Sequence, residues 1–124
     1  MKTALLLMIH GSPYQESNAP LWTLIQKIRE RGLFDDVRIG HLECGEPSIP
    51  EAIRQCVEAG AGRIIALPYF LHLGTHVVCD LPALLRESQT LFPQTQILVT
   101  PHLGASPVLT RILAQRAREA LSAQ

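Results

Sequence analysis

The chain has 124 residues and 47% of them are hydrophobic, which is typical of a single globular domain with one core. Its 11 Lys and Arg residues balance 11 Asp and Glu residues, so the formal net charge is zero. Because non-specific nucleic-acid binding depends on an excess of basic side chains, we expect no nucleic-acid partner.

The longest apolar run, Ala4 to Ile9, is far shorter than the roughly 20 residues that cross a bilayer, so we expect a soluble protein with no membrane partner. The run is also too short for a signal peptide, and His10-Gly11-Ser12-Pro13 follows it in place of a cleavage site. The three cysteines lack paired spacing, which favours a reducing compartment over a disulfide framework. Together these features predict a cytoplasmic protein.

The first half of the chain alternates predicted strands and helices. Residues 4–9 are apolar at every position, as in a strand that is covered on both faces. Apolar residues at helical spacing predict a helix over about 19–31, closed by Gly32. Residues 37–43 alternate between the two faces, which predicts an edge strand. Ser48 is placed to cap a second helix with Glu51 three residues later as the capping-box acid, and 60–62 end it.

The second half continues the alternation. Residues 63–71 predict a second fully buried strand, and 76–92 predict a helix. Pro82 either kinks this helix or lies in the first turn of a new one, because proline has no N–H to donate. A short strand is expected at 96–99 and a closing helix at 107–120. The apolar residues of that helix share one side: Val108, Leu109, Ile112 and Leu113, with Leu121 beyond it.

This order predicts the α/β class, as a three-layer αβα sandwich over one domain, residues 1–124. Placing the two fully apolar strands in the centre gives a four-stranded parallel sheet of order 2-1-3-4, as in flavodoxin-like folds. The chain then reverses direction between the first and third strands. In such sheets the ligand crevice lies beyond the carboxyl ends of the strands at this reversal.

Three histidines lie on the loops at the predicted crevice: His10 after the first strand, and His72 and His76 after the third. Imidazole is a common ligand of divalent metals, and its pKa near 6.5 also suits a general base. Asp80 either accepts the ring N–H of His76 and so orients that ring, or caps or charge-complements a helix that begins near Pro82. The alternative for His72 is a solvated loop residue with no role in the site.

Other polar residues have ordinary structural interpretations beside functional ones. Cys44 and Cys79 are expected to be small buried thiols in preference to metal ligands. Glu43 and Glu46 follow the second strand, where an acid either assists a metal or a proton, or simply precedes a helix. His41 and His102 are interpreted as structural residues. The chain has no glycine-rich dinucleotide or phosphate-loop motif.

Taken together, several segments resemble the CbiX/SirB family of sirohydrochlorin chelatases in its short, single-domain form. The matching segments run the length of the chain in the same order as in the family. Their combination is specific to this family, whereas the His-Gly-Ser motif alone would be weak evidence. The segments that carry it are Leu5 to Ser12, Leu42 to Ala52, Arg63 to Leu71, Gly74 to Val77, Asp80 to Pro82 and Pro101 to Gly104.

The resemblance implies a chelatase-like fold and a lyase of the cobaltochelatase or ferrochelatase type. Such an enzyme inserts Co²⁺, Fe²⁺ or Ni²⁺ into sirohydrochlorin on the pathway to cobalamin, sirohaem or a nickel coenzyme, with no cofactor beyond the metal substrate. It implies that His10 is the proton acceptor and a metal ligand, and that His76 is the second metal ligand. It also implies a homodimer. The substrate-contacting positions that it implies are Glu46, Leu71, His72, Leu73, Gly74, Thr75 and His76.

The chemistry agrees with this assignment on independent grounds. Metal insertion needs a base for the pyrrole protons and a weakly held metal, and two imidazoles supply both while leaving coordination positions open. The sequence also departs from the family pattern: Pro13 replaces an arginine that would pair with a substrate carboxylate, and 77–79 are apolar or thiol residues. The alternative is a metal- or tetrapyrrole-binding carrier without turnover. A flavodoxin-like nucleotide binder rests on fold analogy alone.

Overall fold

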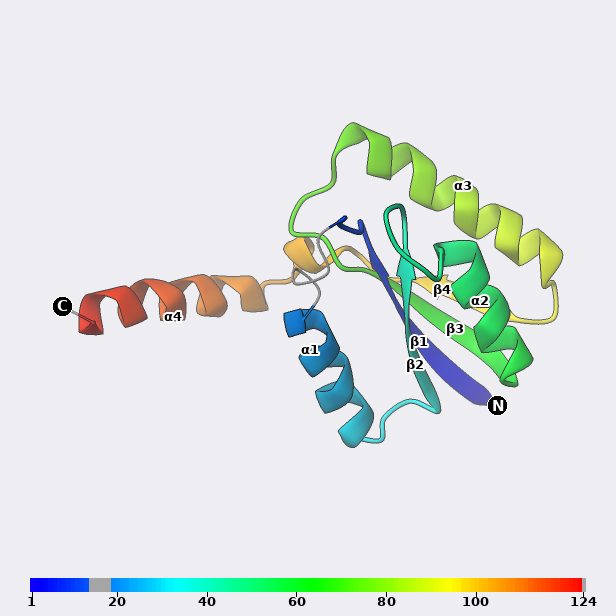
Figure 1. The fold of residues 1–124 in the computed structure, drawn as a ribbon, viewed down its shortest axis with the longest axis horizontal. Coiled ribbons are helices and arrows are strands. Elements are labelled where there is room, and N and C mark those ends of the chain that lie inside the picture. The colour runs from blue at the N-terminus through cyan, green and yellow to red at the C-terminus, as the bar shows by residue number, and fades with distance from the viewer. Residues whose placement is uncertain (14–18, 124) are drawn as a thin grey trace.

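The computed structural model describes residues 1–13 and 19–123, apart from the side chain of His76. Four parallel strands form one sheet in the order β2-β1-β3-β4, as the sequence predicts (Figure 1). Among the described residues no helix combines the length and apolar character that a membrane span requires. The elements are β1 (Lys2–Ile9), α1 (Ala19–Glu30), β2 (Asp36–His41), α2 (Ile49–Glu58), β3 (Ala61–Pro68), α3 (Thr75–Leu91), β4 (Gln96–Val99), the 3-10 helix η2 (Leu103–Ala105) and α4 (Val108–Ser122).

Two apolar clusters cover the two faces of the sheet. Alternate residues of β1 point to opposite sides, so Leu5 and Leu7 pack under α1 while Leu6 and Met8 pack under α2 and α3. All four are buried, which explains why β1 is apolar at every position. The predicted central placement of β1 and β3, with β2 and β4 at the edges, is confirmed.

The start of α2 follows the predicted capping chemistry. The Ser48 hydroxyl accepts a hydrogen bond from the Glu51 N–H at 3.2 Å, and a proline stands in the first turn. The Glu51 side chain does not complete a capping box. It pairs instead with Arg54, whose hydrogen bond holds the pKa of the Glu51 carboxyl below its usual range. The cap is therefore confirmed and the reciprocal acid contact is wrong.

Several predicted boundaries shift by a few residues. β2 ends at His41 and β3 ends at Pro68, so the residues that follow each strand form loops at the carboxyl edge. α3 is one helix with Pro82 inside it, so the alternative of a new helix near Pro82 is wrong. Asp80 lies in the second turn of α3 and therefore does not cap a helix. Because proline has no N–H, one backbone hydrogen bond of α3 is missing, while Val77, Leu81 and Leu85 of the same helix are buried in the core.

The closing helix α4 departs from the expected sandwich. Figure 1 shows α4 extending away from the sheet, beyond the start of α1, so that only α1, α2 and α3 form the outer layers. No residue of α4, all of which the structure describes, is buried. Its exposed apolar side chains include Val108 (53%), Ile112 (44%) and Leu113 (67%). The apolar side of α4 is thus present as predicted but does not cover the sheet of its own chain.

The thiols also differ from expectation, because Cys44 and Cys79 are exposed and only Cys56 is buried. Burial raises the pKa of the Cys56 thiol to about 11, so little of it ionises near neutral pH. We expect iodoacetamide at pH 8 to modify Cys44 and Cys79 in the native protein, and Cys56 only after unfolding. Mass spectrometry of peptides from both samples checks this. Alkylation of Cys56 at the same rate as the other two would contradict the burial.

Candidate functional site

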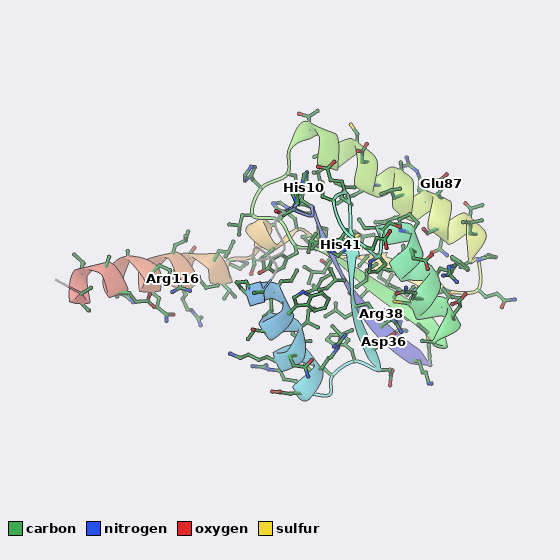
Figure 2. The ribbon with its side chains drawn as sticks, viewed as in Figure 1. His10, Asp36, Arg38, His41, Glu87 and Arg116 are labelled. Carbon is green, nitrogen blue, oxygen red and sulfur yellow. The ribbon has the colours of Figure 1, made fainter. Side chains whose placement is uncertain are left out.

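His10 lies directly after β1, at the carboxyl edge of the sheet. Its Nε2 atom is 3.4 Å from the Oε1 atom of Glu43, and both side chains are about half exposed, at 49% and 51%. Figure 2 shows His10 at the outer end of the sheet, above the centre of the domain. A titratable imidazole beside a carboxylate, both within reach of water, is an arrangement that can accept and release protons.

An aromatic ring supports the imidazole from another strand. Phe70 follows β3, and its ring centroid is 6.4 Å from that of His10 with an interplanar angle of 87°. This edge-to-face geometry is a favourable one for aromatic pairs and restricts the orientation of the imidazole. The ends of β1, β2 and β3 thus each contribute one side chain to the site: His10, Glu43 and Phe70.

Backbone hydrogen bonds hold these three strand ends together. The Glu43 N–H donates to the His10 carbonyl at 3.0 Å, and the Leu42 N–H donates to the Ile9 carbonyl at 2.8 Å. On the other side, the Tyr69 N–H donates to the Met8 carbonyl at 2.8 Å. The strands therefore fix the spacing of the side chains that follow them.

Gly11 makes the close approach of the β2 loop possible. Its φ of +99° lies in a region that favours glycine, and a Cβ atom built on it would lie 1.7 Å from the Glu43 carbonyl oxygen. Any side chain here would push the Glu43 backbone away from His10. The glycine of the His-Gly-Ser motif is thus required by packing as well as by backbone conformation.

The predicted substrate positions after β3 form an exposed loop that leads into α3. Leu71 is 66% exposed and Leu73 is 37% exposed, and His72, Gly74 and Thr75 are exposed as well. The backbone of His76 lies in the first turn of α3, but its side chain is outside the described part of the structure. The pairing of His10 with His76 stays a prediction. Among the described side chains no three His, Cys, Asp or Glu residues gather as a metal site.

Beside this loop, an apolar groove of about 620 Å³ runs from the carboxyl ends of β1 and β3 along α3 to β4. Its lining includes Leu73 and His102 from the loops, Leu85 from α3, and Ile97 and Val99 from β4. Asp80 is half-buried on α3. Glu46 is exposed and lines a separate hollow beside the start of α2 with Ser48 and Glu51.

Sequence reasoning gave Glu43 less weight than the structure supports and did not single out Phe70. Two signals were available for them. Each residue lies at the carboxyl end of a predicted strand that neighbours β1, and the carboxyl ends of parallel strands meet at one edge of the sheet. His41, interpreted as structural, is buried directly beneath the loop that carries Glu43.

Comparisons with known proteins identify the family of this chain and its fold. The family model named CbiX matches residues 4–120. The chain belongs to the CbiX family. Its CbiX relatives include the sirohydrochlorin cobaltochelatase of Methanocaldococcus jannaschii, which is 46% identical over 82 residues, or 66% of this chain and 57% of that protein. The sirohydrochlorin cobaltochelatase of Sulfolobus acidocaldarius is 30% identical over 97% of this chain and 94% of that protein.

A solved structure shows the same CbiX fold. The sirohydrochlorin chelatase SirB from Bacillus subtilis, in complex with cobalt, superimposes with a TM-score of 0.85 at 23% identity. The match covers 96% of this chain but only 51% of SirB. This CbiX chain thus spans about half the length of SirB, and 57% of the length of the Methanocaldococcus protein.

Proposed function

We propose that this chain inserts a divalent metal ion, Co²⁺ or alternatively Fe²⁺ or Ni²⁺, into sirohydrochlorin. The observation that carries the proposal is the His10 imidazole held 3.4 Å from the Glu43 carboxylate at the carboxyl edge of the sheet. Relatives named sirohydrochlorin cobaltochelatase support the substrate. Residues 1–124 act in this proposal as one chelatase domain.

Metal insertion releases two pyrrole protons from the macrocycle for each metal ion that enters. In the proposal, the neutral His10 imidazole accepts a pyrrole proton, and the Glu43 carboxylate attracts the positive charge that forms on the ring. Both side chains are half exposed, so this proton then passes to water and the imidazole is free to accept the second pyrrole proton. Phe70 keeps the imidazole in one orientation during this transfer.

The metal is a substrate and must be held loosely before it is transferred. We assign His10 and His76 as its two protein ligands, with Asp80 orienting the His76 ring from one turn further along α3. A site with two imidazoles leaves coordination positions open for water and pyrrole nitrogens, unlike a closed structural site with four protein ligands. Glu46 and the residues from Leu71 to His76 are assigned to substrate contact.

The enzyme and the carrier hypotheses differ in turnover. The test follows the visible spectrum of anaerobic sirohydrochlorin with Co²⁺, with and without a small fraction of one equivalent of protein. We expect many equivalents of macrocycle to be converted per protein. Stoichiometric binding without acceleration would instead support the carrier, which is motivated by Pro13 in place of the family's arginine and by the apolar or thiol residues at 77–79. Titration with FMN tests the nucleotide-binding alternative, and no binding is expected.

We also propose a cytoplasmic location and a homodimer. Two exposed free thiols, Cys44 and Cys79, are compatible with a reducing compartment. The chain spans about half of SirB, so a second copy would supply an equivalent of the other half. α4 provides a contact for that copy, because its apolar side chains lie away from its own sheet while the groove between α3 and β4 is left open. Reciprocal insertion of α4 into the partner's groove would cover both surfaces.

The dimer makes a specific prediction about α4. Ile112→Glu places a charge in the apolar side of the helix and is expected to convert a dimer of twice 13.7 kDa into a monomer. Thr110→Glu, which adds the same charge on an exposed polar position, is the matched control and should remain dimeric. Light scattering at micromolar concentration measures both masses. A monomeric wild type, or an unchanged dimer with Ile112→Glu, would reject this interface.

A further inference from the structure

His41 is a buried histidine outside the candidate site. It is the last residue of β2 and only 5% exposed. Figure 2 shows His41 closer to the middle of the domain than His10. The residues that follow it, 42–47, form a loop that carries Glu43 and Glu46; we call this segment the glutamate loop.

The imidazole of His41 forms a hydrogen bond with the C-terminal end of the glutamate loop. Its Nδ1 atom is 3.0 Å from the Pro47 carbonyl oxygen, which also accepts the His41 backbone N–H at 2.9 Å. Because a carbonyl can only accept, the bonding Nδ1 atom must carry the proton. The Pro47 carbonyl thus accepts two hydrogen bonds from His41, and these hold the two ends of the loop together.

The same ring also supports the middle of the loop. A Cβ atom built on Gly45 would lie 2.3 Å from the Cδ2 atom and 2.7 Å from the Cγ atom of His41. The Gly45 backbone therefore rests directly on the imidazole. Near the start of the loop, the Glu43 N–H donates to the His10 carbonyl, and Gly11 lies against the Glu43 carbonyl. The glutamate loop is held between the His41 ring and the strand end that carries His10.

We propose that His41 is a positioning residue that holds Glu43 at its distance from His10. The inference rests on the proposed function, in which Glu43 assists His10. His41 touches neither metal nor macrocycle in this arrangement. It acts through the Pro47 carbonyl and the Gly45 backbone. Loss of its Nδ1–H donor therefore removes one of the two hydrogen bonds from His41 to Pro47, loosens the loop and lets the Glu43 carboxylate shift away from the imidazole of His10.

Three substitutions separate the hydrogen bond from the volume of the ring. His41→Phe keeps a ring without a donor. His41→Asn places an amide N–H near the position of Nδ1, while His41→Gln places its amide further out, near the position of Nε2. We expect His41→Phe and His41→Gln to lower kcat for Co²⁺ insertion about tenfold and to raise KM for Co²⁺, with KM for sirohydrochlorin unchanged. His41→Asn should stay within about twofold of wild type. If His41→Phe fails to fold, the comparison of Gln with Asn still decides.

The deciding experiment measures Co²⁺ insertion by His41→Phe and His41→Gln in a protein that also carries Glu43→Gln. Glu30→Gln serves as the control for the loss of an exposed acidic side chain. If His41 acts through Glu43, its substitution should change the remaining rate less than about twofold there. An undiminished tenfold loss in that background, or equal losses for Asn and Gln, would overturn the positioning role. Full activity of Glu43→Gln alone would instead overturn the proposed role of Glu43. The two failures are therefore distinguishable.

Discussion

Replacing His10 with alanine is expected to slow Co²⁺ insertion into sirohydrochlorin by at least about 100-fold, which is the usual contribution of a positioned general base. The substitution also removes one of the two proposed metal ligands. The imidazole is half exposed, and its ring contacts are with Phe70, Glu43 and the Gly11 carbonyl at the edge of the sheet, so the free energy of unfolding should change by less than about 1 kcal/mol. Initial rates at saturating metal and a thermal melt measure the two effects.

Chemical rescue provides the control for this variant. Free imidazole in the buffer should restore part of the rate of His10→Ala, because the cavity left beside Phe70 and Glu43 is open to solvent. A variant that folds normally and inserts metal at the wild-type rate would show that His10 is not the proton acceptor. A variant that melts many degrees lower would show that the ring is structural.

Gly11→Ala is expected to have the largest combined effect on stability and activity. The new Cβ atom would overlap the Glu43 carbonyl, and the φ of +99° disfavours any side chain. We expect the free energy of unfolding to fall by about 2 kcal/mol or more. We expect the insertion rate to fall about 100-fold, because Glu43 must move away from His10.

Gly32→Ala is the matched control for this prediction. Gly32 also has a positive φ, +65°, but nothing lies within 4 Å of a Cβ atom built there. Its substitution should cost about 1–2 kcal/mol from backbone conformation alone and leave the insertion rate unchanged. Urea unfolding and the cobalt assay measure both glycine variants. Equal rates for the two variants would mean that the position of Glu43 does not limit insertion.

Much of the sheet could be predicted because apolar patterning is local. A strand that is buried on both faces must be apolar at every position, and β1 shows this in six consecutive residues. The edge strands and the Ser48 cap are similarly visible in a few neighbouring residues. The strand order then placed His10 at the carboxyl edge of the sheet, and this prediction is confirmed.

The contacts around the site could not be predicted in the same way. The distance between His10 and Glu43 depends on where β2 ends and on how the glutamate loop returns to Pro47. His41 and Cys44 show the limit of local patterns. His41 is buried because the glutamate loop folds over its ring. Cys44 is exposed because it lies on the outer side of that loop.

For this protein, the sequence by itself determined the α/β class, the strand order and the edge of the sheet where the chemistry lies, because these follow from the period of apolar residues along the chain. Only the tertiary structure decided that Glu43 and Phe70 flank His10, that His41 supports the glutamate loop, and that α4 leaves its own sheet uncovered. The reason is that each of these depends on contacts between segments far apart in the chain. An apolar helix face indicates that a partner surface exists, but the pattern is the same whether that surface belongs to the same chain or to a second copy.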